Sequence, residues 1–195
     1  MLWPARSAIR PVPAHAVVSR DAVDSAEAEF ESAEDLESRI TQAFRELDTA
    51  QPSLSKFLRT ELDGVTDDTA SALGQFLGVA VHQAFAEAFG ARLKAVEENS
   101  LSSTRATFEW DEELRRGAAD ELLESDDLVA IGQPHVMAFV REQLDAALEP
   151  DEDGDAPDVD LDAISAVYRT VLIEILALGQ AVPPPRGVIS TGVLM

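Results

Sequence analysis

The sequence contains no cysteine, and aromatic residues make up only 6% of its 195 positions. Without cysteine, the chain can form neither disulfide bonds nor thiolate metal sites, and it has no cysteine nucleophile. Alanine and leucine dominate the apolar residues, and both types favour helices over strands. The apolar share of 46% is large enough for burial to drive the folding of a helical core.

Long apolar runs are also absent. No run approaches the roughly 20 residues of a membrane-spanning helix. The best candidate, 171–182, is shorter and carries Glu174. Residues 1–20 contain three prolines and no continuous apolar core, so they do not resemble a secretory signal. We therefore expect a cytoplasmic protein that has no membrane partner.

Basic residues are scarce: 37 acidic residues stand against 15 basic ones, which gives a formal net charge of −22. Such a surface repels nucleic acids and anionic lipid headgroups, so we expect neither as a partner. The Arg115-Arg116 pair is too small a basic spot to bind a nucleic acid. A proteome adapted to molar salt would give a similar composition. The acidity therefore reflects either a high-salt habitat or a function.

Apolar residues recur at helical spacing through most of the chain, and no strong strand alternation appears. The patterns predict helices over residues 36–51, 52–64, 66–96, 111–124, 134–148 and 160–180. We therefore predict an all-α protein, a single helical bundle of about six helices, over residues 32–182 with an acidic loop at 149–160. Residues 1–31 are expected to form a flexible, basic, proline-containing N-terminal arm. Residues 183–195 are expected to form a triproline hinge and an apolar C-terminal tail.

Several helix boundaries carry their own signals. Ser32, followed three residues later by Asp35, is a variant of the capping box. Pro52 and Pro134 stand where proline favours the first turn of a helix. Residues 99–107 are rich in serine and threonine and predict a loop. Two glycines one turn apart in the long third helix would let another helix approach closely: Gly74 and Gly78.

The motifs that carry catalysis or bind metals are missing or incomplete. Neither Glu-x-x-His nor His-x-x-x-His occurs around the three histidines, His15, His82 and His135. Three aspartates, at 151, 153 and 155, alternate as in a calcium loop, but Ala156 stands where the turn requires glycine. Glycine-rich phosphate loops are absent. We therefore predict no metal, no cofactor and no catalytic residue, which favours a protein that is not an enzyme over an enzyme.

Glu174 is the most anomalous residue of the body, because it interrupts an apolar helix. Inside a core its carboxyl group must be paired with an arginine, protonated, or turned to the edge of the bundle. The hydroxyl group of Tyr168 is a second polar group on the same helix. The two residues together mark a candidate pocket, in which a carboxyl group with a perturbed pKa could act as an acid or base. A structural role is the competing interpretation.

The C-terminal tail differs in kind from the rest. After the triproline, residues 187–195 read GVISTGVLM and contain no acidic residue. An exposed apolar segment usually marks a surface that another protein segment buries. Polyproline is a stiff spacer that would hold this segment away from the body. A docking peptide would then add a strand to a partner or fill its groove. The candidate contact residues are Val188, Ile189, Gly192, Val193 and Leu194.

Residues 189–194, with the sequence ISTGVL, resemble the short C-terminal addressing peptides of encapsulin cargo proteins, which follow a linker and read apolar-Ser/Thr-x-Gly-x-Leu. The leading hypothesis is a non-enzymatic acidic helical adaptor or assembly protein whose tail docks to a protein partner. One alternative is a small helical enzyme or ligand-binding regulator with a pocket near Tyr168 and Glu174. Another is an obligate homo-oligomer whose tail completes a neighbouring subunit.

Overall fold

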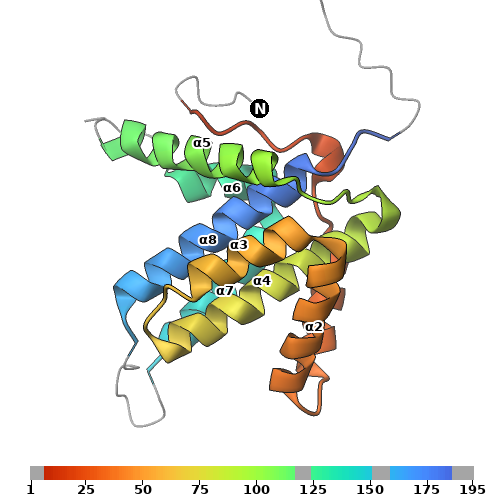
Figure 1. Ribbon diagram of the computed structural model, residues 1–195, viewed down its shortest axis with the longest axis vertical. Coiled ribbons are helices and arrows are strands. Elements are labelled where there is room, and N and C mark those ends of the chain that lie inside the picture. Colours follow the sequence, from red (N-terminus) through yellow and green to blue (C-terminus); the bar gives the residue numbers. More distant parts are fainter. Residues whose placement is uncertain (1–6, 117–123, 151–158, 186–195) are drawn as a thin grey trace, which may run out of the picture.

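The computed structural model describes residues 7–116, 124–150 and 159–185, and within these ranges it contains helices but no strand (Figure 1). The all-α prediction is confirmed. The described residues form eight α-helices rather than about six, together with two 3₁₀ turns. In chain order the elements are η1 (Ala14–Ala16), α1 (Arg20–Glu31), α2 (Leu36–Ala50), α3 (Pro52–Leu62), α4 (Asp68–Phe89), η2 (Gly90–Arg92), α5 (Glu98–Arg116), α6 (Ser125–Gly132), α7 (Pro134–Leu148) and α8 (Leu161–Gln180).

Residues 7–31 belong to the bundle, which corrects the expectation of a flexible arm over 1–31. The side chain of Ser19 accepts a hydrogen bond from the amide of Ala22 and so caps α1. Before α1 the described chain has no α-helix and only the 3₁₀ turn η1, yet Ile9 and Val18 are buried in the common core. Prolines disfavour a continuous α-helix here, but they do not prevent the segment from packing on helices formed by later residues.

The centre of the bundle is the contact between α4 and α8. In the view of Figure 1, the ribbon of α3 lies between those of α4 and α8. Gly74 and Gly78 make this contact close, as predicted. A Cβ atom at Gly74 would collide with Leu62 of α3 and crowd Val167 of α8. A Cβ atom at Gly78 would lie 3.1 Å from Leu58 of α3. Two helices therefore approach α4 where it has no side chain.

Helix α8 is buried over nearly its whole second half, from Thr170 to Gly179. This agrees with the apolar character of that stretch on all sides of the helix. Among the helices that the structure describes, none is both long and apolar enough to cross a membrane.

Helix α5 replaces the loop that the serines and threonines of residues 99–107 predict. Leu101, Thr104 and Phe108 follow one another at steps of three and four residues and are buried. The intervening polar residues lie on the outer face, where serine and threonine are tolerated. Residues 111–116 of the predicted helix over 111–124 are thus the end of the longer helix α5, and residues 117–123 lie outside the described residues.

The helix boundaries agree with most of the sequence signals. Pro52 and Pro134 open α3 and α7 in the first turn, as predicted. The cap of α2 is Asp35, whose carboxylate accepts a hydrogen bond from the amide of Ser38, and Ser32 instead ends α1. Helix α4 stops at Phe89, earlier than predicted, because Gly90 has a φ of 49° that other residues rarely adopt.

Two buried glutamines, each directly before a helix-opening proline, hold the bundle together in the same way. The side chain of Gln51 donates to the carbonyl of Lys94 at 3.0 Å and accepts from the amide of Val96 at 2.7 Å. The side chain of Gln133 donates to the carbonyl of Ala16 at 2.6 Å and accepts from the amide of Val18 at 2.9 Å. Each glutamine side chain therefore binds the backbone of a distant segment through one donated and one accepted hydrogen bond, the pair of bonds that a neighbouring β-strand would make.

Candidate functional site

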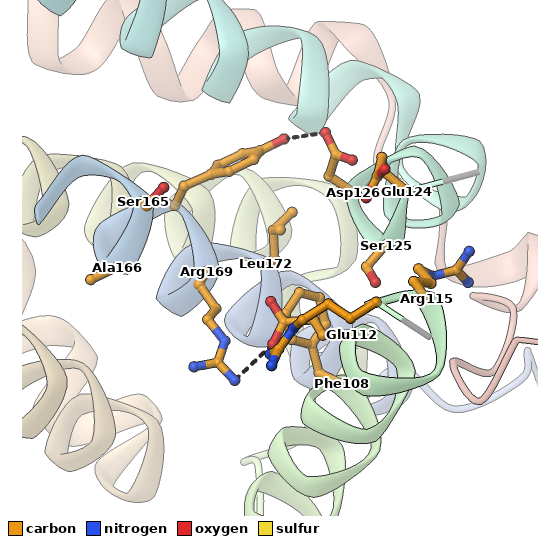
Figure 2. Close-up of a pocket in the computed structure, with 12 residues that line it drawn as sticks. Phe108, Glu112, Arg115, Glu124, Ser125, Asp126, Ser165, Ala166, Arg169 and Leu172 are labelled. Carbon is orange, nitrogen blue, oxygen red and sulfur yellow. Dashed lines mark hydrogen bonds and ion pairs between the residues drawn. The ribbon is translucent and has the colours of Figure 1, made fainter. Parts of the chain in front are cut away.

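A cleft of about 680 Å³ lies between α5, α6 and α8. Figure 2 shows Glu112 of α5 and Arg169 of α8 facing each other, with Ser125 of α6 nearby. The lining residues are Phe108, Glu112, Arg115 and Arg116 from α5, Glu124, Ser125 and Asp126 at the start of α6, and Ser165, Ala166, Tyr168, Arg169 and Leu172 from α8.

Beneath one wall of the cleft lies Asp111, whose side chain is completely buried. Its Oδ1 accepts hydrogen bonds from the hydroxyl of Ser7 at 3.0 Å and the amide of Ala8 at 2.7 Å. Its Oδ2 accepts from Arg115 Nε at 2.5 Å and from the hydroxyl of Ser125 at 2.8 Å. Burial alone would raise the pKa of Asp111, but the four hydrogen bonds outweigh it and lower that pKa. Asp111 thus joins three separate segments and fixes Arg115.

Most charged groups on the cleft wall are already paired. The Nη2 atom of Arg169 lies 2.8 Å from Oε2 of Glu112 and 3.6 Å from Oε1 of Glu109. Asp126 accepts a hydrogen bond from the hydroxyl of Tyr168 at 2.9 Å and also one from Arg141 at 2.9 Å. Burial raises the pKa of Tyr168 to about 12, so its hydroxyl stays protonated at neutral pH. Two of the three carboxylates on the wall are therefore occupied by donors from the protein itself.

Donors without partners remain at the cleft. The Nε atom of Arg169 is buried and makes no hydrogen bond within the described part of the chain. Arg116 is exposed and takes part in none of the ion pairs between described residues. Helix α6 begins at the cleft without a hydrogen bond from the side chain of its cap residue, Glu124. The cleft therefore offers more free donors than free acceptors, since Glu124 is the one carboxylate on its wall that no described residue engages.

Glu174 does not share this cleft, so the structure does not bring the two predicted pocket residues together. Tyr168 lines the cleft, whereas Glu174 faces α4, where its Oε2 would lie 3.6 Å from a Cβ atom on Gly78. Glu174 is fully buried, and neither oxygen has a hydrogen-bond partner among the described residues. Burial raises its pKa well above 4.5. Of the three states that the sequence allows, the structure therefore favours the protonated one.

The histidines occupy separate places. His15 Nε2 lies 3.1 Å from the carbonyl oxygen of Val182, and burial lowers the pKa of His82 to about 4. His135 is exposed at the start of α7. No group of three potential metal ligands exists among the described residues, and the alternating aspartates at 151–155 lie outside them.

The end of the described chain is held where the triproline begins. The carbonyl of Ala181 accepts a hydrogen bond from the amide of Lys94 at 3.1 Å, and Val182 is buried. Arg92 donates to the carbonyl of Pro183 at 3.3 Å, and the next two prolines are exposed. The chain therefore leaves the bundle from one fixed point. The predicted docking residues, Val188, Ile189, Gly192, Val193 and Leu194, lie outside the described residues.

Sequence reasoning recognised Arg115-Arg116 as a basic spot but missed the cleft beside it and the role of Asp111. The four-residue spacing from Asp111 to Arg115 is a signal of a helical ion pair, although it does not reveal burial. Comparison of the chain with protein-family models, with curated proteins and with solved structures gives no match.

Proposed function

We propose that the protein is an acidic helical adaptor or assembly protein, in which the bundle serves as a preformed body and the apolar segment after the triproline docks to a protein partner. The observation that carries the proposal is the fixed exit of the chain at Ala181–Pro183. A docking peptide benefits from a stiff spacer that starts at a defined place, because a spacer of this kind limits where the peptide can reach.

Three separate contacts support this role of the exit. His15, Arg92 and Lys94 come from two distant parts of the chain, and each engages a backbone group of residues 181–183. Beyond them, exposed Pro184 and Pro185 cannot continue α8, because proline lacks the amide hydrogen that a helix interior requires. Val182 is the last buried residue in the described part of the chain.

The composition of the tail supports a protein partner rather than a charged polymer. Residues 187–195 carry no ionisable side chain, whereas the whole chain has a net charge of −22. Apolar residues interspersed with Ser190, Thr191 and Gly192 suit an extended peptide that is added to a sheet edge or laid in a groove. A partner with an apolar groove of neutral or positive potential would avoid repulsion by the acidic bundle.

The experiment compares the full chain with a truncated chain that ends at Pro185, each used as bait in a native lysate and analysed by mass spectrometry. Ending at Pro185 retains every contact of the exit, so the truncated bundle should unfold at the same temperature as the full chain. The proposal expects a protein that the full chain recovers and the truncated chain loses. Leu194→Asp should lose it as well, whereas Thr191→Ser should retain it.

Self-association is the alternative that the same samples test. Light scattering coupled to size-exclusion chromatography gives the mass of both chains. An oligomer that dissociates on truncation would favour the homo-oligomer hypothesis over a separate partner. If both baits recover all partners equally and both have the same number of subunits, the adaptor hypothesis is contradicted.

A further inference from the structure

We infer that the cleft between α5, α6 and α8 is a binding site for a small organic anion, whose carboxylate or phosphate group pairs with Arg116 and whose apolar part rests on Phe108 and Leu172. This site goes beyond the adaptor role, because it uses none of the tail. The ligand would bind the bundle itself, about where α6 starts.

The hydrogen-bonding inventory of the wall selects an anion. The acceptors that could receive a cationic ligand are largely engaged: Glu112 by Arg169, and Asp126 by Tyr168 and Arg141. The donors are not. Arg116 has no ion-pair partner in the described chain, and the buried Nε of Arg169 has no acceptor. A buried donor without an acceptor is costly, and an anion supplies an acceptor for the guanidinium of Arg116 and for the Nε of Arg169.

Local charge supports the same choice. In the whole chain acidic residues outnumber basic ones by 37 to 15, whereas arginines equal carboxylates on the cleft wall. The positive end of the α6 dipole also lies there, uncapped by the side chain of Glu124. By count the cleft wall is thus neutral, whereas the whole chain is strongly acidic. Asp111 holds Arg115 in place from below.

The size and the floor of the cleft select an organic ligand rather than an inorganic ion. Its volume of about 680 Å³ falls within the range of sites for small molecules. Phe108 and Leu172 are almost fully buried and contribute an apolar floor, and Ala166 lies exposed beside it on α8. An apolar ring or short chain would cover this floor while the anionic group reaches Arg116.

The test uses four probes of one shape on the full chain: benzoate, phenyl phosphate, neutral benzamide and cationic benzylamine. Isothermal titration calorimetry measures affinity, and heteronuclear NMR locates the contact. The expected result is saturable binding of benzoate or phenyl phosphate, with shifted amide signals in α5, α6 and α8. Whichever of benzoate and phenyl phosphate binds with the higher affinity shows whether the site prefers a carboxylate or a phosphate group. Benzamide and benzylamine should bind more weakly by about tenfold or more, because neither pairs with an arginine.

Two variants and one control decide whether this cleft is the site. Arg116→Ala removes an exposed side chain, leaves the fold intact and should weaken binding by about tenfold or more. Ala166→Trp fills the cleft from an exposed position without changing charge, and should also block binding. Arg105→Ala, on the same helix but outside the cleft, should bind as the unchanged protein does. Binding of neither anion, equal binding of benzamide, or full affinity in Arg116→Ala would overturn the inference.

Discussion

Replacement of Glu174 should make the protein more stable at neutral pH, although it removes a group from the middle of the core. Glu174 is fully buried, and neither of its oxygens has a partner among the described residues. Its raised pKa means that folding must keep the carboxyl group protonated at a pH where the unfolded chain releases the proton. Glu174→Gln abolishes this titration and keeps the shape. Glu174→Met also removes the polar atoms.

The magnitude follows from proton linkage. Below the ordinary pKa of 4.5 both states carry the proton, so the unchanged protein and Glu174→Gln should respond alike to pH. Above it the unfolded chain binds fewer protons than the folded one, so the free energy of unfolding falls by about 1.4 kcal/mol per pH unit. The loss continues until the pH reaches the raised pKa of the folded state. Glu174→Met gains about 1–3 kcal/mol more, because no buried polar group remains without a partner.

The assay is urea unfolding followed by circular dichroism between about pH 4 and about pH 8. The difference in the free energy of unfolding between Glu174→Gln and the unchanged protein should be constant in acid and rise above about pH 4.5. The titration of His82 is common to both proteins and cancels in this difference. A difference that stays flat across the range, or a Glu174→Met variant that is several kcal/mol less stable at neutral pH, would refute the reasoning.

Three further predictions concern buried polar groups. Gln51→Ala and Gln133→Ala should each lower the free energy of unfolding by roughly 2 to 4 kcal/mol, because each removes two hydrogen bonds to the backbone of a distant segment and leaves at least one buried backbone group unpaired. Losses below about 1 kcal/mol in urea titrations would show that the glutamine side chains do not stabilise the bundle. Between the ordinary pKa of 6.5 and the lowered value of about 4, His82 should reduce stability as the pH falls, since only the unfolded chain takes up the proton, and His82→Gln should remove this slope in the same titrations. Asp111→Asn should cost about 3–5 kcal/mol by leaving Arg115 beside an uncharged partner; a melting temperature close to that of the unchanged protein would contradict the network.

Helical periodicity predicts the helices that bury a continuous apolar stripe. The stripes of α2, α3, α7 and α8 are visible in the sequence because leucines, valines and phenylalanines recur at steps of three and four. The prediction failed for α5, where Thr104 stands between Leu101 and Phe108 in the buried row. Serines and threonines around that row dominate its local composition and conceal the period.

Contacts between distant residues account for the remaining differences. The packing of Val18 depends on Gln133, 115 positions later, and no local pattern reveals that hydrogen bond. The burial of Asp111 depends likewise on Ser7 and Ala8. The sequence identified Glu174 as anomalous and Tyr168 as a pocket residue. Six residues of an α-helix turn through about 600°, so their spacing already puts the two side chains about 120° apart. What each face of α8 meets depends on the packing of α4 and α5 against that helix, which the sequence pattern does not reveal.

The most direct test of the adaptor role is transfer of residues 183–195 to an unrelated monomeric carrier. A carrier with this segment should recover the same partner as the full chain, and a carrier with the Leu194→Asp segment should not. The account predicts that the segment alone gives an affinity close to that of the full chain, because the bundle adds no contact of its own. A segment that recovers nothing, while the truncated bundle still binds the partner, would contradict it.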